Sequence, residues 1–108
     1  MSINTQLVTT SKASVYTSGG NSAITNLTLC NYHASDTAVI TLHVVPNGVA
    51  LVDIADEHMM LKSLSITAGD TYVLYSGSEK VLLDDGDYIS VISTVSSAIT
   101  AITSYTAI

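Results

Sequence analysis

Short runs of strand-forming residues, separated by Gly and Asn about every ten positions, constrain the fold of this chain most strongly. Val, Ile, Thr and Tyr dominate these runs, whereas the helix formers Glu, Lys, Gln and Arg are scarce. This pattern is typical of an all-β sandwich or barrel. We therefore expect a single antiparallel β-sandwich, jelly-roll-like, with about eight strands.

Apolar residues two positions apart indicate strands with one buried face. The alternation includes Leu27 and Leu29, then Ile40, Leu42 and Val44, and the series Ile99, Ala101, Thr103 and Tyr105. The candidate strands cover residues 3–9, 13–17, 23–32, 37–45, 61–67, 71–76, 80–83, 87–95 and 98–107.

Four segments have the composition of turns. Residues 18–21 (SGGN) resemble a flexible link, and the Asn-Gly pair in residues 46–48 suits a positive φ. Residues 68–70 and 84–87 each precede an apolar run and contain Asp and Gly. We expect tight turns there, in which Asp side chains accept hydrogen bonds from nearby backbone N–H groups.

Residues 51–60 leave two structures open, a short helix capped by Asp53 or an irregular loop. The same segment gathers Asp53, Asp56 and Glu57 immediately before His58. Carboxylate oxygens in such a cluster are ligands for a hard cation, and the alternative is a solvated acidic loop.

Length and charge restrict the classes of function. The 108 residues suffice for one domain, residues 1–108, in which residues 1–11 form an extended N-terminal arm. The chain has three Lys, no Arg and a net charge of −6, which argues against nucleic-acid binding and a basic membrane surface. Its apolar runs are shorter than a membrane span, and the residues after Met1 do not resemble a signal peptide.

No arrangement of residues indicates catalysis or a cofactor. There is no Gly-x-Ser-x-Gly segment, and His33, His43 and His58 lack metal-ligand spacing to one another or to Cys30. A single cysteine allows no internal disulfide. We therefore expect a protein that is not an enzyme. Only 11% of residues are charged, which suggests that part of the surface is covered by copies of the chain or by a larger particle.

Six further segments occur in a recognisable order: residues 15–20 (VYTSGG), 27–31 (LTLCN), 43–48 (HVVPNG), 67–74 (TAGDTYVL), 80–87 (KVLLDDGD) and 104–108 (SYTAI). Together these segments resemble small virion structural proteins of tailed bacteriophages, particularly those of phages that infect cyanobacteria. The resemblance extends from about Lys12 to Ile108, and it rests on the order of the segments more than on any one of them.

The resemblance implies a β-sandwich subunit of the virion, with no catalytic residues. The leading hypothesis is a capsid decoration (cement) protein that binds the lattice of the major capsid protein and forms a homo-oligomer, with a trimer favoured. The alternative is a neck, tail or fibre protein, including a receptor- or glycan-binding module that uses exposed tyrosines.

Two segments are candidate contact sites with these partners. Residues 49–60 depart from the family pattern, because they are apolar and acidic where Gly and Ser are expected. The candidate contact residues of this loop are Val49, Leu51, Val52, Asp53, Ile54, Asp56, Glu57, His58, Met59 and Met60. The candidate contacts of the N-terminal arm, which would add a strand to a neighbouring sheet, are Ile3, Leu7 and Val8.

Overall fold

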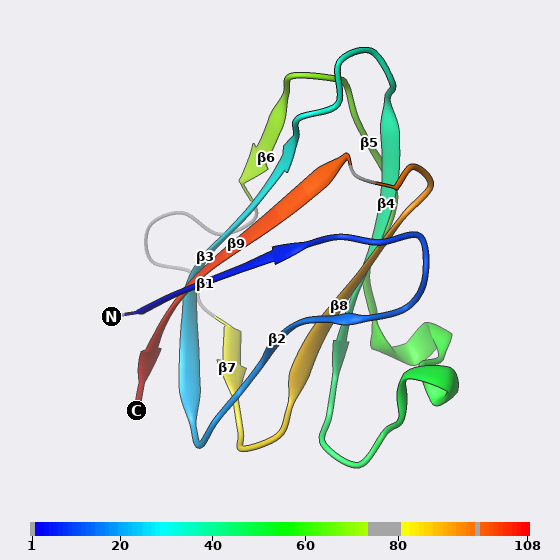
Figure 1. Cartoon of the computed structure of the whole chain (residues 1–108). Coiled ribbons are helices and arrows are strands. Elements are labelled where there is room, and N and C mark those ends of the chain that lie inside the picture. Colours follow the sequence, from blue (N-terminus) through cyan, green and yellow to red (C-terminus); the bar gives the residue numbers. More distant parts are fainter. Residues whose placement is uncertain (1, 74–80, 97) are drawn as a thin grey trace.

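The fold is a sandwich of two antiparallel sheets, seen in a computed structural model that describes residues 2–73, 81–96 and 98–108 (Figure 1). The first sheet has the strand order β1-β9-β3-β6, and β7 also pairs with β3. The second sheet has the order β2-β8-β4-β5. The strands are β1 (Ser2–Leu7), β2 (Ser14–Thr17), β3 (Ser22–Asn31), β4 (Ala38–Val45), β5 (Met59–Ile66), β6 (Thr71–Val73), β7 (Val81–Leu83), β8 (Tyr88–Ser93) and β9 (Ile99–Ala107).

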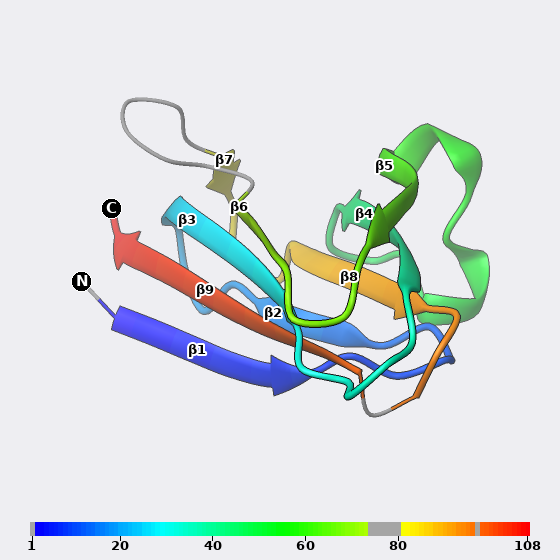
Figure 2. The same ribbon diagram turned by 90° about the horizontal axis from the view of Figure 1, so that it is seen from above.

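The predicted fold class is confirmed, and each of the nine strands lies within about two residues of a predicted segment. The strands predicted over 71–76 and 80–83 extend partly into residues 74–80, which lie outside the described residues. Figure 2 shows the two sheets side by side, with β1 and β2 at the same rim of the sandwich.

The core lies between the sheets and is built by the alternation seen in the sequence. Leu27 and Leu29 of β3 and Ile40 and Leu42 of β4 are completely buried, as is Ile99 of β9. Truncation of such a side chain to Ala typically costs about 2–5 kcal/mol of stability. The apolar alternation therefore selects the inner face of each sheet.

The turns at one end of the sandwich are hydrogen-bonded to one another. As predicted, an Asp side chain closes the turn of residues 84–87, because the Asp87 carboxylate accepts the N–H of Asp84 at 2.9 Å. The segment predicted as a flexible link is instead held in place. Gly20 N donates to Asp85 Oδ1 at 2.8 Å, and Ser18 O accepts the N–H of Gly86 at 2.9 Å.

Residues 51–60 form neither a capped helix nor a wholly irregular loop. They contain two single 3-10 turns, η1 (Leu51–Asp53) and η2 (Asp56–His58), and then enter β5. Asp53 does not cap η1, which begins after Ala50 without a side-chain cap. Nucleation of an α-helix is unfavourable, and a turn of three residues forms too few hydrogen bonds to offset that free-energy cost. Within the described residues, no helix has the length and apolar character needed to cross a bilayer.

Candidate functional site

The first candidate site is the segment of residues 49–60, called the 49–60 loop below, which is fixed to the sandwich at three points. Tyr88 donates its hydroxyl proton to the carbonyl oxygen of Val49 at 2.7 Å. Ile54 is buried against Val45 and Tyr88 in a small apolar cluster separate from the main core. Lys12 Nζ donates to the carbonyl oxygen of Ile54 at 3.4 Å. The backbone of the loop is thereby held against one end of β4 and β8.

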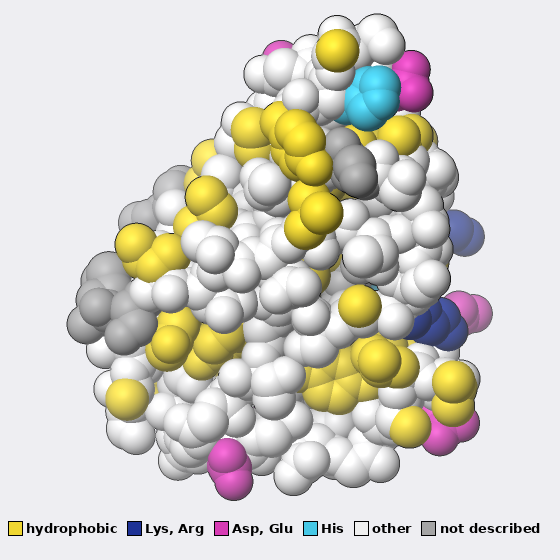
Figure 3. All heavy atoms as spheres, viewed as in Figure 1, with side chains coloured by type: hydrophobic (Ala, Val, Ile, Leu, Met, Phe, Trp, Pro, Cys, Tyr) yellow, Lys and Arg dark blue, Asp and Glu magenta, His cyan; other side chains and the backbone are white. Residues whose placement is uncertain are grey.

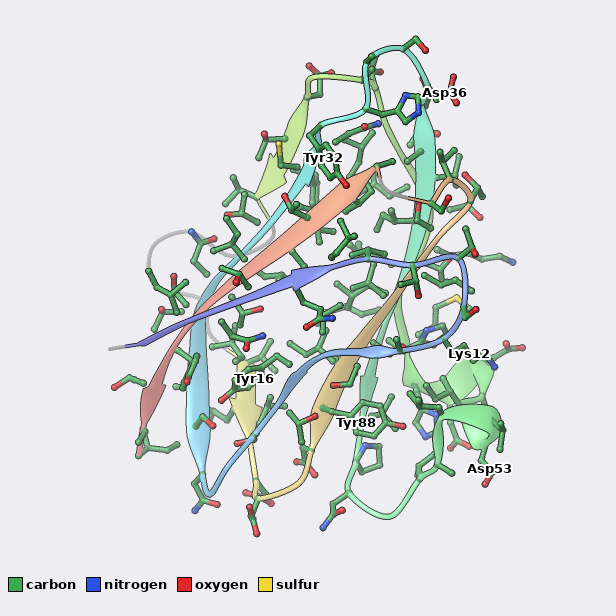
Figure 4. All side chains as sticks on the ribbon, viewed as in Figure 1. Lys12, Tyr16, Tyr32, Asp36, Asp53 and Tyr88 are labelled. Carbon is green, nitrogen blue, oxygen red and sulfur yellow. The ribbon has the colours of Figure 1, made fainter. Side chains whose placement is uncertain are left out.

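The outward side of the 49–60 loop combines apolar and acidic side chains. Val52 is 85% exposed and Leu51 38% exposed, beside the exposed carboxylates of Asp53, Asp56 and Glu57. In Figure 4, Lys12 and Tyr88 lie on the side of the loop that faces the sandwich, and Asp53 lies on its outer side. An anchored backbone with exposed apolar tips suits contact with another protein, because little entropy is lost on binding.

The other candidate residues of this loop are less available. Ile54 is 7% exposed and anchors the loop instead of presenting a contact surface. His58 and Met59 are half-buried, and His58 Nδ1 accepts the N–H of Ala55 at 3.0 Å. Met60 is 44% exposed at the start of β5.

A buried histidine lies on β4 beside the 49–60 loop. His43 is paired in register with Met59 of β5. Burial lowers the pKa of His43, the positive charge of Lys12 and the nearby His58 lower it further, and Asp56 opposes them. Burial of His43 therefore favours its neutral form.

The acidic cluster before His58 is not joined by further metal-ligating groups. Among residues 2–73, 81–96 and 98–108, no group of three or more His, Cys, Asp or Glu side chains is arranged to hold a metal ion. The side chains of Asp53, Asp56 and Glu57 are exposed to solvent.

The second candidate site is β1, the segment predicted as an N-terminal arm. Residues 2–7 form the edge strand of the chain's own sheet, and they pair with β9 in a register that places Leu7 opposite Thr100. Ile3 is 68% and Leu7 43% exposed, whereas Val8 is buried in the main core and donates its N–H to Ile99 O at 2.9 Å. Val8 therefore anchors the strand and is not a surface contact.

The outer face of β1, β9 and β3 carries no charge. None of the three strands contains Asp, Glu, Lys, Arg or His, although the chain has a net charge of −6. Figure 3 looks toward the rim where β1 and β2 lie, and in this view the Asp, Glu and Lys side chains lie near the periphery of the molecule. A shallow hollow on this face is lined by Thr5, Gln6, Leu7, Thr100 and Ile102.

The sequence interpretation did not identify this face. The sequence does contain two uncharged stretches, because residues 13–35 and 88–108 have no Asp, Glu, Lys or Arg. Periodicity alone, however, does not reveal which uncharged strands are neighbours.

A second hollow lies on the other sheet, between β4, β5 and β8. It is lined by Thr10, Val39, Thr41, Ser63, Ile92, Ser93 and Thr94.

The tyrosines are mostly unavailable as stacking surfaces for a glycan. The rings of Tyr16 and Tyr105 pack together with centroids 4.7 Å apart, and Tyr88 is buried. Tyr72 is half-buried, and Tyr32 is the exposed tyrosine among those that the structure describes, at 49%. Tyr75 lies outside the described residues.

Comparisons of this chain with protein-family models, with curated proteins and with solved structures find no match.

Proposed function

We propose that this chain is a structural subunit of a tailed-phage virion, and specifically a capsid decoration protein that binds the lattice of the major capsid protein. The proposal is supported above all by the combination of an anchored backbone and exposed apolar side chains in the 49–60 loop. Its backbone is anchored by Tyr88 and Ile54, and it presents Leu51 and Val52 to solvent. The resemblance of the six sequence segments to small virion proteins supports a phage virion as the assembly to which the chain binds.

The chemistry of the loop suits a shared interface with a large assembly. Exposed Val52 supplies apolar area, and burial of such a side chain contributes roughly 1.5–3 kcal/mol. Asp53, Asp56 and Glu57 are exposed in the same loop, and their negative charges favour contact with a neutral or basic surface. The subunits of the expected homo-oligomer would be linked, so their contacts with the lattice would act together, and modest contacts would then give a high overall affinity.

A glycan-binding tail or fibre module is the second candidate, and Tyr32 is the residue that favours it. Tyr32 is 49% exposed just after the end of β3, where a sugar ring could stack on its side chain. This function predicts saturable binding to a host-surface polysaccharide that Tyr32→Ala removes. The decoration function predicts that Tyr32→Ala leaves virion binding unchanged.

The direct test is quantitative mass spectrometry of purified virions of the phage that encodes the chain, after separation of heads from tails. A decoration protein is present in many copies and fractionates with heads. Recovery with tails supports the alternative location, and absence from the virion excludes both.

A binding experiment then tests the loop. Val52→Asp adds a negative charge and removes apolar area at the proposed contact, so we expect affinity for undecorated heads to fall about tenfold or more. Ser65→Asp is the matched control, because Ser65 is also exposed but lies on β5, outside the loop. Equal binding of the two variants would contradict the assignment of the contact to the 49–60 loop.

A further inference from the structure

The free edge of β1 is unlike the other sheet edges in the described part of the chain. β2 has four residues and a register shift between Ser14 and Tyr16. β5 has an interrupted register with β4, the exposed Lys62, and Ser63 at a φ of 54°. β6 and β7 each have three residues in the described part of the chain. Bulges, lysines and short length are devices that prevent an edge from pairing with another strand.

β1 has none of these devices. It has six residues, no charged side chain and an unbroken register with β9 from Ser2↔Tyr105 to Leu7↔Thr100. Figure 2 shows β1 at the rim of its sheet, with β9 on one side and no described strand of that sheet on the other. β1 is therefore the edge best suited to accept an additional strand.

The hydrogen-bond pattern identifies which residues face the free edge. The N–H of Val8 bonds to Ile99 O, so the Val8–Ile99 pair belongs to the hydrogen-bonded class. Because the two classes of pair alternate along an antiparallel ladder, the backbone groups of Ile3, Thr5 and Leu7 point away from β9. The side chains of the same three residues are exposed on the outer face.

Ile3 and Leu7 are equally distant from Thr5 along β1, so two copies of the strand can pair with each other symmetrically. A second copy of β1 that runs antiparallel, about a two-fold axis at Thr5, places each Ile3 opposite Leu7 of the other copy. In this register the outward backbone groups of Ile3, Thr5 and Leu7 all meet partners. The exposed apolar side chains then form two cross-strand pairs of the kind that stabilises sheets.

Charge permits this contact between identical chains. Two copies with a net charge of −6 repel one another, but β1 and its neighbour β9 hold no charged residue that would be brought into the interface. A head-to-tail contact would need a second unprotected edge, and the other described edges are short, bulged or charged. The structure therefore favours a second copy, paired isologously, as the occupant.

We propose that two copies of this chain form a two-fold dimer by antiparallel pairing of their β1 strands, with Thr5 at the axis. The pairing joins the two β1-β9-β3 sheets into one continuous sheet across the dimer. This inference goes beyond the proposed function and does not depend on it, because it uses a different surface from the 49–60 loop. It also differs from the trimer expected from the sequence.

Sedimentation equilibrium of the purified chain, with no tag at its N-terminus, tests the proposal. We expect a concentration-dependent species of twice the 11.3 kDa chain mass. Thr5→Pro removes an N–H that faces the free edge and is not needed by β9, so the chain still folds and dimer affinity falls about 100-fold or more. Thr5→Val keeps the N–H and is the matched control. We expect it to dimerise like the original chain.

A charge-exchange experiment tests the register. Thr5→Lys and Thr5→Glu each place like charges together at the axis, so each variant alone is expected to be monomeric. An equimolar mixture brings Lys opposite Glu and restores the dimer. Circular dichroism and thermal unfolding confirm that each variant is folded. A chain that stays monomeric at millimolar concentration, a trimer unaffected by Thr5→Pro, or a mixture that fails to associate would each overturn the proposal.

Discussion

The side chain of Asn47 lies directly over Gly86, so that a β-carbon at residue 86 would be 2.5 Å from Asn47 Cγ. Gly86 also has a φ of 85°, a conformation that costs other residues about 1–2 kcal/mol. The two turns are joined beside this contact, because Asn47 N donates to Asp87 Oδ1 at 2.8 Å. The end of the sandwich therefore depends on a glycine for two separate reasons.

Three glycine substitutions measure separately the effect of the positive φ and the effect of the Asn47 contact. Gly86→Ala introduces both the backbone strain and the contact with Asn47, and is expected to lower the free energy of unfolding by about 2–3 kcal/mol. Gly69→Ala introduces strain alone, because Gly69 has a φ of 85° with open space around it, and should cost about 1 kcal/mol. Gly19→Ala introduces neither and should change stability by less than about 0.5 kcal/mol.

Urea denaturation gives all three values. Adding Asn47→Ala to Gly86→Ala should bring the cost down to that of Gly69→Ala, because only the positive φ then remains. A cost for Gly86→Ala no larger than that of Gly69→Ala would mean that the Asn47 side chain moves aside freely.

A second prediction concerns Asn31, which joins the two sheets. Its side chain is completely buried, and Nδ2 donates to Ile66 O of β5 at 2.7 Å and to Asp36 O at 3.0 Å. Its Oδ1 accepts the N–H of His33 at 3.0 Å. Asn31→Ala leaves these backbone groups without their partner and should lower the free energy of unfolding by about 3 kcal/mol.

Asn31→Asp distinguishes loss of hydrogen bonds from loss of volume. A carboxylate at this position faces the carbonyl oxygens of Ile66 and Asp36, so Asn31→Asp should be less stable than Asn31→Ala at pH 7. Asn21→Ala is the control, because that side chain is exposed, and its unfolding midpoint should match the original chain. If Asn31→Asp proved as stable as the original chain, the donor role of Nδ2 would be excluded.

A third prediction concerns the anchor of the 49–60 loop. Tyr88→Phe removes the hydrogen bond to Val49 O and should cost about 1 kcal/mol, together with faster amide hydrogen exchange within the loop. Tyr32→Phe removes an exposed hydroxyl and should leave both measurements unchanged. If amide exchange in Tyr88→Phe is unchanged, the packing of Ile54 and the Lys12 hydrogen bond hold the loop without the Tyr88 hydroxyl.

The same tyrosine predicts sensitivity to alkaline pH. Burial raises the pKa of Tyr88, with a further contribution from Asp53. A raised pKa in the folded state means that the contribution to stability is complete below the unfolded pKa of about 10 and is lost as the pH rises through the folded pKa. Unfolding midpoints above pH 9.5 should therefore fall more steeply for the original chain than for Tyr88→Phe.

The fourth prediction concerns His43 and acid. Burial lowers the pKa of His43, so the unfolded chain binds the proton more readily than the folded chain. Stability is therefore complete above the unfolded pKa of about 6.5 and declines as the pH falls below it. His43→Gln should flatten the dependence of the unfolding free energy on pH between about 7 and 5. His33→Gln should retain it, and a steep dependence in both variants would assign the effect to other groups.

Much of the fold follows from local pattern. The alternation of Leu27 with Leu29 and of Ile40 with Leu42 selects the buried face of each strand, because side chains point to opposite faces at successive residues. The Asn-Gly pair at 47–48 and the Asp-rich turn at 84–87 place the chain reversals, because these residue types satisfy the backbone of a turn locally.

The candidate sites depended on contacts between distant segments. Ile54 resembles its neighbours in the sequence, and its burial depends on Val45 at the end of β4 and on Tyr88, which lies far along the chain at the start of β8. Val8 likewise continues the pattern of β1, but it packs into the core. The exposure of a side chain in an irregular segment is set by whatever long-range partner covers it, and periodicity carries no such information.

The sequence by itself determined the class of fold, the strand positions and the inner face of the sandwich, since propensity and alternation act between near neighbours. Only the tertiary structure decided that β1, β9 and β3 are adjacent, that their uncharged outer sides form one face, and that β1 is left as an unprotected edge. Strand order is a property of the closed sheet, because it depends on pairings between segments up to the full length of the chain apart.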